Sequence, residues 1–314
     1  MEATQYDIAI IGAGPAGLTA ALYAGRSMVR SVILESKAPG GQLLNTELIE
    51  DYPGFKSILG GDLAVVMTEQ ATQFGAELVN SPVKRIRVEP DGMKVIETDA
   101  GEVRAPAVII TAGGNPRKLD VPGEVEYAGR GVSYCAVCDG AFFRDVHLAV
   151  VGGGDAAVEE SLYLTRYASG VTLIHRRDEF RAQPLLVDEA RHHPKIELLL
   201  DTVVNSIDGD GSVTHLNLSN VKTFEHSRLN AGGVFIFVGF IPNTGLVDGH
   251  VDHDAAGYYY TDPLTMMTNI PGIFAAGDVR SQLTRQITTA VGDATTATIA
   301  ATKWVEARAK QHAG

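Results

Sequence analysis

A short glycine-rich pattern occurs twice in this chain, each time between an apolar run and a segment with helical periodicity. The first copy, Gly12-Ala13-Gly14-Pro15-Ala16-Gly17, follows the run Tyr6–Ile11, and the second, Gly152-Gly153-Gly154-Asp155-Ala156-Ala157, follows His147–Val151. Such apolar runs are typical of strands buried on both faces of a parallel sheet. Glycines at this spacing allow the tight turn from strand to helix, and the helix N-terminus attracts a pyrophosphate. The duplication predicts an α/β fold with two Rossmann-like dinucleotide-binding domains, and 314 residues are enough for both.

The end of the next strand indicates which dinucleotide the first site holds. The predicted strand Ser31–Leu34 leads into Glu35, which lies 18 residues after Gly17. A carboxylate at this point accepts hydrogen bonds from a ribose 2′-hydroxyl and repels a 2′-phosphate. The first site is therefore predicted to hold NAD or FAD.

The corresponding position of the second copy carries positive charge instead. The strand Val171–Ile174 leads into His175-Arg176-Arg177, and Arg181 follows four residues later. Guanidinium groups bind phosphate in a bidentate manner. This placement at the ribose end of the site predicts a 2′-phosphate, and hence NADP rather than NAD.

The two cysteines of the chain lie in the stretch Val132–Gly140, as Cys135 and Cys138, and Asp139 follows directly. This C-x-x-C spacing brings two sulfurs close enough to interconvert dithiol and disulfide. Zinc would need further ligands that no second cysteine pair supplies, so no metal site is predicted. Two unrelated buried cysteines remain an alternative, whereas a stabilising disulfide across so short a loop would gain little. Redox chemistry is the preferred interpretation.

Charge and hydropathy restrict the partners. A net charge of -12 argues against a general nucleic-acid surface, because phosphate binding needs a basic face. No apolar run approaches the roughly 20 residues of a membrane span. Two cysteines in a redox motif fit a reducing compartment. We therefore expect a cytoplasmic protein that binds neither nucleic acid nor membrane.

Other segments complete the expected organisation. Asn115–Pro122 and Gly239–Thr244 are candidate linkers, and Tyr258–Tyr260 is expected to form a strand beside a turn. A helix is expected over Val158–Tyr167, after the second glycine pattern. Ile273–Ala276 is a predicted strand that ends at Gly277-Asp278, before a helical run from Thr288 to Glu306.

Several strings together resemble one known family over essentially the whole chain. They are Pro39-Gly40-Gly41-Gln42, Cys135-Ala136-Val137-Cys138-Asp139-Gly140, His175-Arg176-Arg177 with Arg181 and Ala182, Phe274-Ala275-Ala276-Gly277-Asp278-Val279 and Arg285-Gln286. In these strings the chain resembles the bacterial low-molecular-weight thioredoxin reductases, class II of the pyridine nucleotide-disulfide oxidoreductases.

The resemblance implies where each cofactor binds. FAD is expected in a discontinuous domain made of residues 1–116 and 243–314, and NADPH in an inserted domain, 117–242, that carries the dithiol. The residues implied for FAD are Gly12, Gly14, Pro15, Ala16, Glu35, Ser36, Gly41, Gln42, Asp51, Val83, Ala112, Gly113, Gly277, Asp278, Arg285, Gln286 and Ile287. Those implied for NADPH are Gly152, Gly154, Asp155, Ala156, His175, Arg176, Arg177 and Arg181.

The resemblance also implies the roles at the dithiol. Cys138 is expected nearest the flavin, Cys135 exchanges with the disulfide of thioredoxin, and Asp139 acts as general acid and base. A homodimer is implied as well. Three positions depart from the family pattern, namely Asp51, Thr284 and Ala156.

Other functions on the same scaffold remain open. A dithiol oxidase that uses oxygen would have no use for the arginine cluster, which argues against it. A reductase fed by ferredoxin or reduced flavin is a second alternative. A nucleotide-binding redox sensor without turnover is a third, and thiol turnover with NADPH would distinguish it from a reductase.

Overall fold

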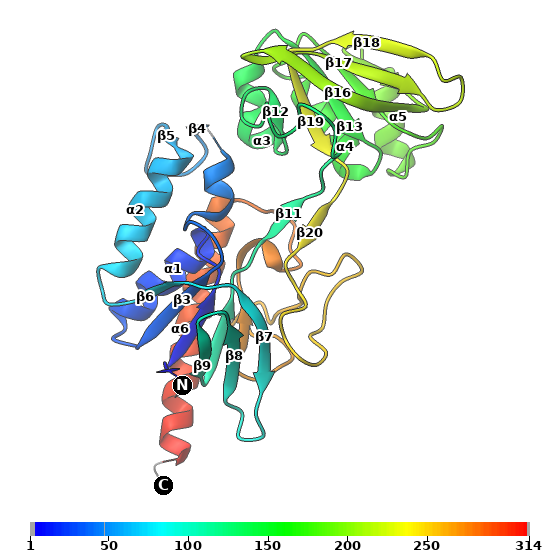
Figure 1. Cartoon of the computed structure of the whole chain (residues 1–314). Coiled ribbons are helices and arrows are strands. Elements are labelled where there is room, and N and C mark those ends of the chain that lie inside the picture. Colours follow the sequence, from blue (N-terminus) through cyan, green and yellow to red (C-terminus); the bar gives the residue numbers. More distant parts are fainter. Residues whose placement is uncertain (1–3, 47, 313–314) are drawn as a thin grey trace. The chain divides into compact units, whose positions relative to one another are not determined.

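In a computed structural model that describes residues 4–46 and 48–312, the chain folds into two compact units (Figure 1). The first unit combines Met1–Asn115 with Ile241–Gly314, and the second is Pro116–Phe240. The chain leaves the first unit through strand β11 (Gly114–Pro116) and returns through β20 (Phe240–Pro242), and these two strands pair with each other. The first unit is therefore discontinuous in sequence.

The first unit contains a five-stranded parallel sheet in the order β21-β10-β2-β3-β6. Its strands are β2 (Ile8–Ile11), β3 (Ser31–Glu35), β6 (Glu77–Asn80), β10 (Ala107–Ile110) and β21 (Ile273–Ala275). The helices are α1 (Pro15–Arg26), α2 (Gly60–Thr72) and α6 (Ile287–His312), with short 3-10 helices η1 (Gly41–Asn45) and η3 (Gly277–Val279). A second sheet has the order β1-β9-β8-β7, from β1 (Thr4–Gln5), β7 (Val83–Val88), β8 (Lys94–Thr98) and β9 (Gly101–Ala105). The short strands β4 (Leu48–Ile49) and β5 (Ile58–Leu59) form a separate pair.

Both faces of the parallel sheet are covered by apolar layers. Ile8 and Ile10 of β2 belong to the core shared with α1, α2 and α6. Ala9 and Ile11 belong to the core on the opposite face, which includes Ile86 of the second sheet. Because successive side chains of a strand point to opposite faces, a strand between two such layers has to be apolar throughout. This burial explains why Ile8–Ile11, directly before the glycine pattern, is apolar without interruption.

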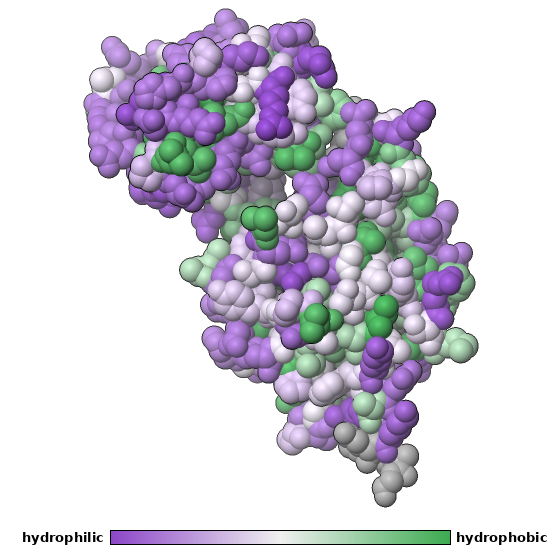
Figure 2. All heavy atoms as spheres, turned by 180° about the vertical axis from the view of Figure 1, so that it is seen from behind, coloured by the Kyte–Doolittle hydropathy of each residue, from purple (hydrophilic) through white to green (hydrophobic). Residues whose placement is uncertain are grey.

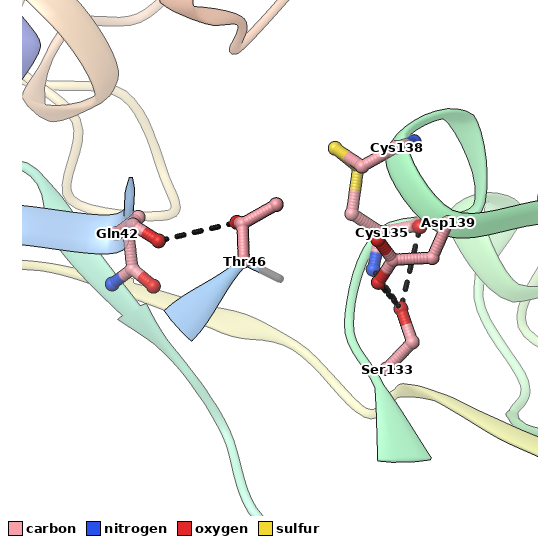
Figure 3. Close-up of a disulfide and its surroundings, with 6 residues drawn as sticks. All are labelled: Gln42, Thr46, Ser133, Cys135, Cys138 and Asp139. Carbon is pink, nitrogen blue, oxygen red and sulfur yellow. Dashed lines mark hydrogen bonds between the residues drawn. A yellow bond between two sulfur atoms is a disulfide. The ribbon is translucent and has the colours of Figure 1, made fainter. Parts of the chain in front are cut away.

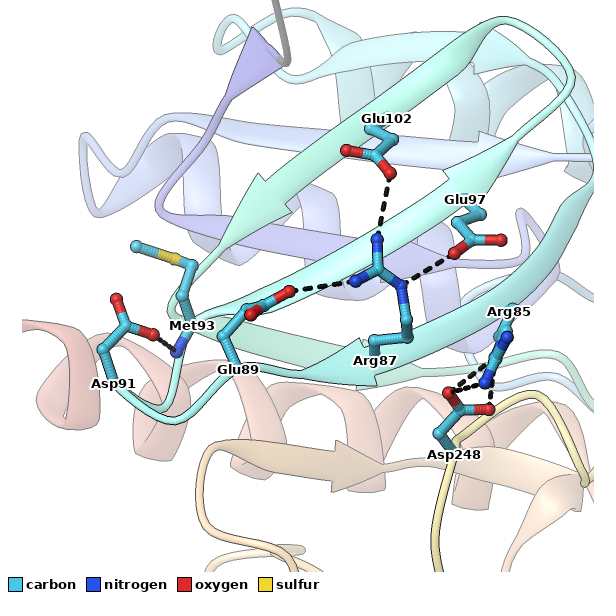
Figure 4. Close-up of polar contacts among 8 residues, drawn as sticks. All are labelled: Arg85, Arg87, Glu89, Asp91, Met93, Glu97, Glu102 and Asp248. Carbon is cyan, nitrogen blue, oxygen red and sulfur yellow. Dashed lines mark hydrogen bonds and ion pairs between the residues drawn. The ribbon is translucent and has the colours of Figure 1, made fainter.

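Salt bridges strengthen the second sheet of this unit (Figure 4). Arg87 on β7 contacts three carboxylates, with Nε 2.7 Å from Glu97, Nη1 3.0 Å from Glu89 and Nη2 3.0 Å from Glu102. These contacts raise the pKa of the arginine, chiefly through its hydrogen bond to Glu97. One guanidinium thus neutralises acids from three strands or turns that would otherwise repel one another.

The second unit repeats this plan with a parallel sheet in the order β12-β19-β13-β14-β15. Its strands are β12 (Val132–Ser133), β13 (His147–Gly152), β14 (Gly170–Ile174), β15 (Ile196–Leu199) and β19 (Gly233–Phe237). The helices are α3 (Ala136–Asp139), α4 (Asp155–Leu164) and α5 (Pro184–His192), with the 3-10 helix η2 (Gly140–Phe143). A three-stranded antiparallel sheet consists of β16 (Thr202–Asp210), β17 (Ser212–Asn220) and β18 (His226–Asn230).

The layers of the second unit match those of the first. Leu148 and Val150 of β13 pack with α4 on one face of the sheet. Ala149 and Val151 pack on the other face, against a layer that includes Leu216 of the antiparallel sheet. The predicted α/β fold with two Rossmann-like units is confirmed.

Two expected elements differ in the structure. Helix α4 spans Asp155–Leu164 rather than Val158–Tyr167, because the last positions of the glycine pattern already form its first turn. The segment Tyr258–Tyr260 is not a strand, and only Tyr259 makes isolated bridges, to His253 and Arg280. No continuous strand of the described chain runs beside it, so its backbone cannot form a ladder.

The surface combines polar and apolar side chains. On the face shown in Figure 2, hydrophobic residues lie scattered among hydrophilic ones, as is normal for a folded protein. Across residues 4–46 and 48–312, no helix has both the length and the apolarity needed to cross a membrane.

Candidate functional site

The first glycine loop joins β2 to α1 in a turn that only glycine fits. Gly12 has a φ of 103°, and a Cβ there would lie 2.7 Å from the carbonyl oxygen of Thr111 on the neighbouring strand end. A Cβ on Gly17 would lie 1.8 Å from the Gly12 oxygen. At Gly14, which precedes the helix, a Cβ would meet only Gly41 at 3.9 Å. The loop thus packs tightly against the sheet and leaves space beside the helix N-terminus, as a bound pyrophosphate requires.

Glu35 lies against this loop at the end of β3. Its Oε2 accepts a hydrogen bond from the backbone nitrogen of Ala13 at 2.6 Å, and its Oε1 accepts from the backbone nitrogens of Ser36 and Lys37 at 2.8 and 2.9 Å. A carboxylate offers about four acceptor positions, and the hydrogen bond from Ala13 occupies one of those on Oε2. The arrangement fits an acid held beside the glycines with capacity for a ribose hydroxyl.

A second group of candidate residues lies where β21 meets η3, before α6. The backbone nitrogen of Gly277 donates to Asp293 Oδ2 at 3.1 Å, and Asp293 Oδ1 lies 2.7 Å from Nη1 of Arg280. Both side chains of this ion pair are close to 90% buried, at 11% and 12% exposure. A Cβ at position 277 would lie 3.1 Å from Ala16 of the first loop. The buried pair therefore fixes Gly277 against α1.

Asp278 and Arg285 supply charge in the same region. Burial raises the pKa of Asp278, while Arg285 opposes that change. The Arg285 guanidinium lies 3.9 Å from the centroid of the Tyr258 ring, and its Nε is buried without a hydrogen-bond partner among the described residues. A buried donor without an acceptor is costly. This orphaned nitrogen fits a bound group that presents an acceptor, as a flavin does.

The other residues expected around FAD lie at varying distances from the loop. The Gln42 amide donates to the Gly114 oxygen at 2.9 Å, and Ala112 and Gly113 each accept a hydrogen bond from Asn243. Asp51 and Thr284 are exposed.

The structure brings together six of the residues predicted for FAD, namely Gly12, Gly14, Ala16, Gly41, Ala112 and Gly277. Pro15, Ser36, Gln286 and Ile287 adjoin members of the site in sequence. Val83 and Ala112 both pack against the core that contains Ala9 and Ile11. Within the described residues, no hydrogen bond joins Asp51 to this group.

The second glycine loop joins β13 to α4 with similar packing. A Cβ on Gly152 would lie 2.5 Å from the carbonyl oxygen of Phe237, whereas a Cβ on Gly154 would meet nothing within 4 Å. Asp155 Oδ1 accepts from the backbone nitrogen of Gln183 at 2.7 Å, and Ala156 is exposed. The loop is therefore closed toward the sheet and open at the helix N-terminus.

His175 lies behind this loop rather than on the surface. It is 6% exposed, its ring stacks on Phe180 with centroids 5.1 Å apart, and Nε2 lies 3.1 Å from the Glu179 oxygen. A Cβ on Gly153 would lie 2.1 Å from its ring. Burial lowers the pKa of His175, and Arg177 and Arg181 lower it further. The imidazole is thus a neutral packing group under the glycine turn at neutral pH.

The three arginines remain available beside it. Arg176, Arg177 and Arg181 are exposed, and the backbone nitrogen of Arg181 donates to the Gly153 oxygen at 2.7 Å. Among the described residues, no acceptor or carboxylate pairs with their guanidinium groups. Three such cations on one short loop fit an anionic ligand.

Cys135 and Cys138 form a disulfide at the start of α3, with Cα atoms 5.3 Å apart (Figure 3). The backbone nitrogen of Cys138 donates to Cys135 Sγ at 3.2 Å. Asp139 ends α3, and its Oδ2 accepts a hydrogen bond from the Ser133 hydroxyl at 2.5 Å. In the first unit, Figure 3 also shows Thr46 donating to the Gln42 oxygen at 3.3 Å. The C-x-x-C spacing thus places both sulfurs on one helical turn, and Asp139 follows Cys138 directly in the chain.

The sequence did not indicate every residue that holds the segment Val132–Gly140, which carries the two cysteines and is called the redox loop below. Ser133 and Glu124 were not predicted, although both are buried, at 4% and 1% exposure. Glu124 accepts from the backbone nitrogens of Leu119 and Asp120 at 3.0 and 2.7 Å, and from the Tyr134 hydroxyl at 2.8 Å. Nothing in the sequence marks Glu124 as a buried residue, since a glutamate in a loop is normally exposed.

The chain matches the family model described as pyridine nucleotide-disulphide oxidoreductase over residues 6–294. It is 49% identical over 306 residues to a thioredoxin reductase of Listeria monocytogenes, which covers 97% of this chain and 95% of that protein. It is 46% identical to a thioredoxin reductase of Bacillus subtilis, with 97% and 96% covered. The crystal structure of thioredoxin reductase from Streptococcus pyogenes superposes with a TM-score of 0.93 at 48% identity, over 98% of this chain and 100% of that one.

These matches cover both units and agree with the resemblance seen in the sequence motifs. The family and these relatives imply a flavin and a pyridine nucleotide. Electron transfer from a pyridine nucleotide through a flavin to a disulfide needs two nucleotide sites and a redox-active cysteine pair. The two glycine loops and the disulfide of Cys135 with Cys138 supply these features. The chain belongs to the pyridine nucleotide-disulphide oxidoreductase family and is an oxidoreductase that acts on a sulfur group.

Proposed function

We propose that the protein is an NADPH-dependent flavoprotein that reduces the disulfide of thioredoxin through FAD and the Cys135/Cys138 dithiol. The observation that carries the proposal is the disulfide itself, formed on one turn with Asp139 adjacent. The similarity to proteins named thioredoxin reductase supports the choice of substrate.

FAD is assigned to the first unit. Glu35 at the glycine loop suits a ribose with a free 2′-hydroxyl, and the orphaned Nε of Arg285 suits an acceptor atom of the flavin. Held by these residues, FAD would supply two-electron redox chemistry between the nicotinamide and the Cys135–Cys138 disulfide. Asp293 and Arg280 hold Gly277 in place for this site.

NADPH is assigned to the second unit. Gly154 leaves room for the pyrophosphate at the N-terminus of α4, and Arg176, Arg177 and Arg181 would bind the 2′-phosphate. His175 would contribute to the NADPH site by packing, because its buried ring lies against Gly153, whose carbonyl oxygen accepts a hydrogen bond from the backbone of Arg181. Asp155 holds the same loop through Gln183.

The dithiol would reduce thioredoxin by two exchange steps. Cys135 attacks one sulfur of the thioredoxin disulfide as a thiolate, which forms a mixed disulfide and releases the other thioredoxin sulfur. Cys138 then attacks Cys135 Sγ, which closes the enzyme disulfide and releases the second thioredoxin sulfur. The two protons of the enzyme thiols finish on thioredoxin, with two electrons. Asp139 accepts the proton of Cys138 in this direction and returns one when the enzyme disulfide is reduced.

A homodimer in the cytoplasm completes the proposal. The likeness to thioredoxin reductases supports the dimer, and a dithiol that has to be kept reduced supports the compartment. Light scattering of the purified holoenzyme should give twice the monomer mass of 33.4 kDa.

The test of the function is an anaerobic titration of the purified protein with NADPH, followed by oxidised thioredoxin. The flavin absorbance should bleach with NADPH and return when thioredoxin is added, while thioredoxin thiols appear. A Cys138→Ser variant should still bleach, but its exchange should stop at the mixed disulfide with Cys135, so that at most one thioredoxin thiol appears per enzyme and no turnover follows. A flavin that stays oxidised with NADPH, but bleaches with reduced ferredoxin or reduced flavin, would contradict the proposed donor. Bleaching without any thioredoxin thiols would contradict the proposed substrate.

A further inference from the structure

Ser133 connects the two functional ends of the redox loop. It belongs to β12, is 4% exposed, and precedes Cys135 by two residues. Its Oγ lies 2.5 Å from Asp139 Oδ2, 3.1 Å from the backbone nitrogen of Cys135 and 3.3 Å from the Cys135 carbonyl oxygen. One hydroxyl therefore contacts both the candidate general acid and the backbone of the exchanging cysteine (Figure 3).

The directions of these hydrogen bonds follow from what a hydroxyl can do. A serine has one hydrogen to donate and two lone pairs. The Cys135 N–H is a donor, so Oγ accepts from it. The hydrogen then points to the nearer of the two acceptors, the Asp139 carboxylate, because hydrogen bonds from O–H to O⁻ are the short and strong ones.

We propose that Ser133 is a positioning residue for the redox reaction, which orients the Asp139 carboxylate for proton transfer to and from Cys138. This inference rests on the proposed role of Asp139. Two consequences follow from the geometry. The donated bond stabilises the carboxylate relative to the carboxylic acid, and it restricts the side chain to one rotamer. Because Ser133 Oγ also accepts a hydrogen bond from the Cys135 N–H, the serine links the Asp139 carboxylate to the backbone of the exchanging cysteine.

The test is the reaction of the dithiol with a small aromatic disulfide, after reduction by dithiothreitol, followed as a function of pH. This reaction needs neither NADPH nor thioredoxin, so it can fail or succeed independently of the proposed function. Ser133→Ala should slow exchange about 10-fold, because general acid–base catalysis contributes roughly 10²–10⁴-fold in total. It should also move the acid limb of the pH profile to higher pH, while Ser133→Thr, which keeps the hydroxyl, restores most of the rate and the profile.

Two controls separate positioning from general stability. Ser206→Ala removes another serine-to-aspartate hydrogen bond of the same unit, the 2.6 Å contact to Asp208 Oδ2, and should leave the rate and pH profile unchanged. In an Asp139→Asn background, Ser133→Ala should add almost nothing, since the serine acts through Asp139. The proposal is overturned if Ser133→Ala keeps the wild-type pH profile, or if it slows Asp139→Asn as much as it slows the wild type.

Discussion

At the scale of single residues, Arg177 provides a test of cofactor choice. It lies on the exposed loop that follows β14, and its guanidinium has no carboxylate partner among the described residues. A hydrogen bond to a charged group contributes about 1.5–3 kcal/mol, so Arg177→Ala should raise the KM for NADPH about 10-fold to 100-fold. The KM for NADH should hardly change, since NADH lacks the 2′-phosphate.

Steady-state kinetics with both nucleotides would measure this difference. Arg191→Ala is a matched control, because it removes an exposed arginine from the end of α5 in the same unit. An equal loss with NADH would show that Arg177 supports the loop rather than the phosphate.

Lys94 gives a residue-scale prediction about pH. It is 1% exposed, donates to the Pro106 oxygen at 2.9 Å, and its pKa is lowered to about 8 by burial and by Arg308. Between pH 8 and about 10.5 the unfolded chain holds this proton while the folded chain does not, so stability should rise with pH in that window.

The expected gain is about 3 kcal/mol, from a depression of roughly two pKa units or more. Denaturant unfolding at several pH values would measure it, with Lys94→Met as the reference variant that lacks the group. A wild-type curve that stays parallel to that of Lys94→Met would exclude the depressed pKa.

At the scale of elements, a partly buried hydrogen bond from Tyr134 to Glu124 joins the redox loop to the preceding loop. Burial raises the pKa of Tyr134, and the bond to Glu124 raises it further. Tyr134→Phe leaves the Glu124 carboxylate with only the two backbone donors, and should destabilise the second unit by about 1–3 kcal/mol. Thermal unfolding would detect this loss. Tyr260→Phe, an exposed tyrosine in the first unit, should change nothing, and a Tyr134→Phe variant as stable as wild type would contradict the anchoring role.

At the scale of the whole molecule, the two units have separate cores and should respond separately to their ligands. A ligand stabilises the state it binds, by about 4 kcal/mol at 1,000 times its Kd. Removal of FAD should therefore increase hydrogen exchange in α1 and β3. Addition of NADP⁺ should slow exchange in α4 and β14. Mass spectrometry of the exchanged peptides would show each effect, and protection of α4 by FAD would contradict the assignment of cofactors to units.

The sequence alone determined the repeated strand, glycine loop and helix, and the pair of cysteines, because these depend on local chemistry. A strand covered on both faces has to be apolar, and a turn with a Cβ clash at Gly12 or Gly17 has to be glycine. The same reasoning explains why Glu35 could be predicted, since its place follows from the length of one βαβ unit. The family resemblance rested on short sequence motifs of this kind, and the comparisons with known proteins confirmed it.

Only the tertiary structure decided how other residues are used, because their partners come from distant parts of the chain. His175 was expected on a phosphate, yet it is buried between Gly153 and Phe180. Glu124 occurs in a loop, but it becomes a buried anchor because two backbone donors and Tyr134 converge on it. Ser133 is an ordinary strand residue in the sequence, and it acquires its contact with Asp139 only when α3 turns the carboxylate back toward β12. Burial and hydrogen bonding are properties of the folded packing, and no local pattern encodes them.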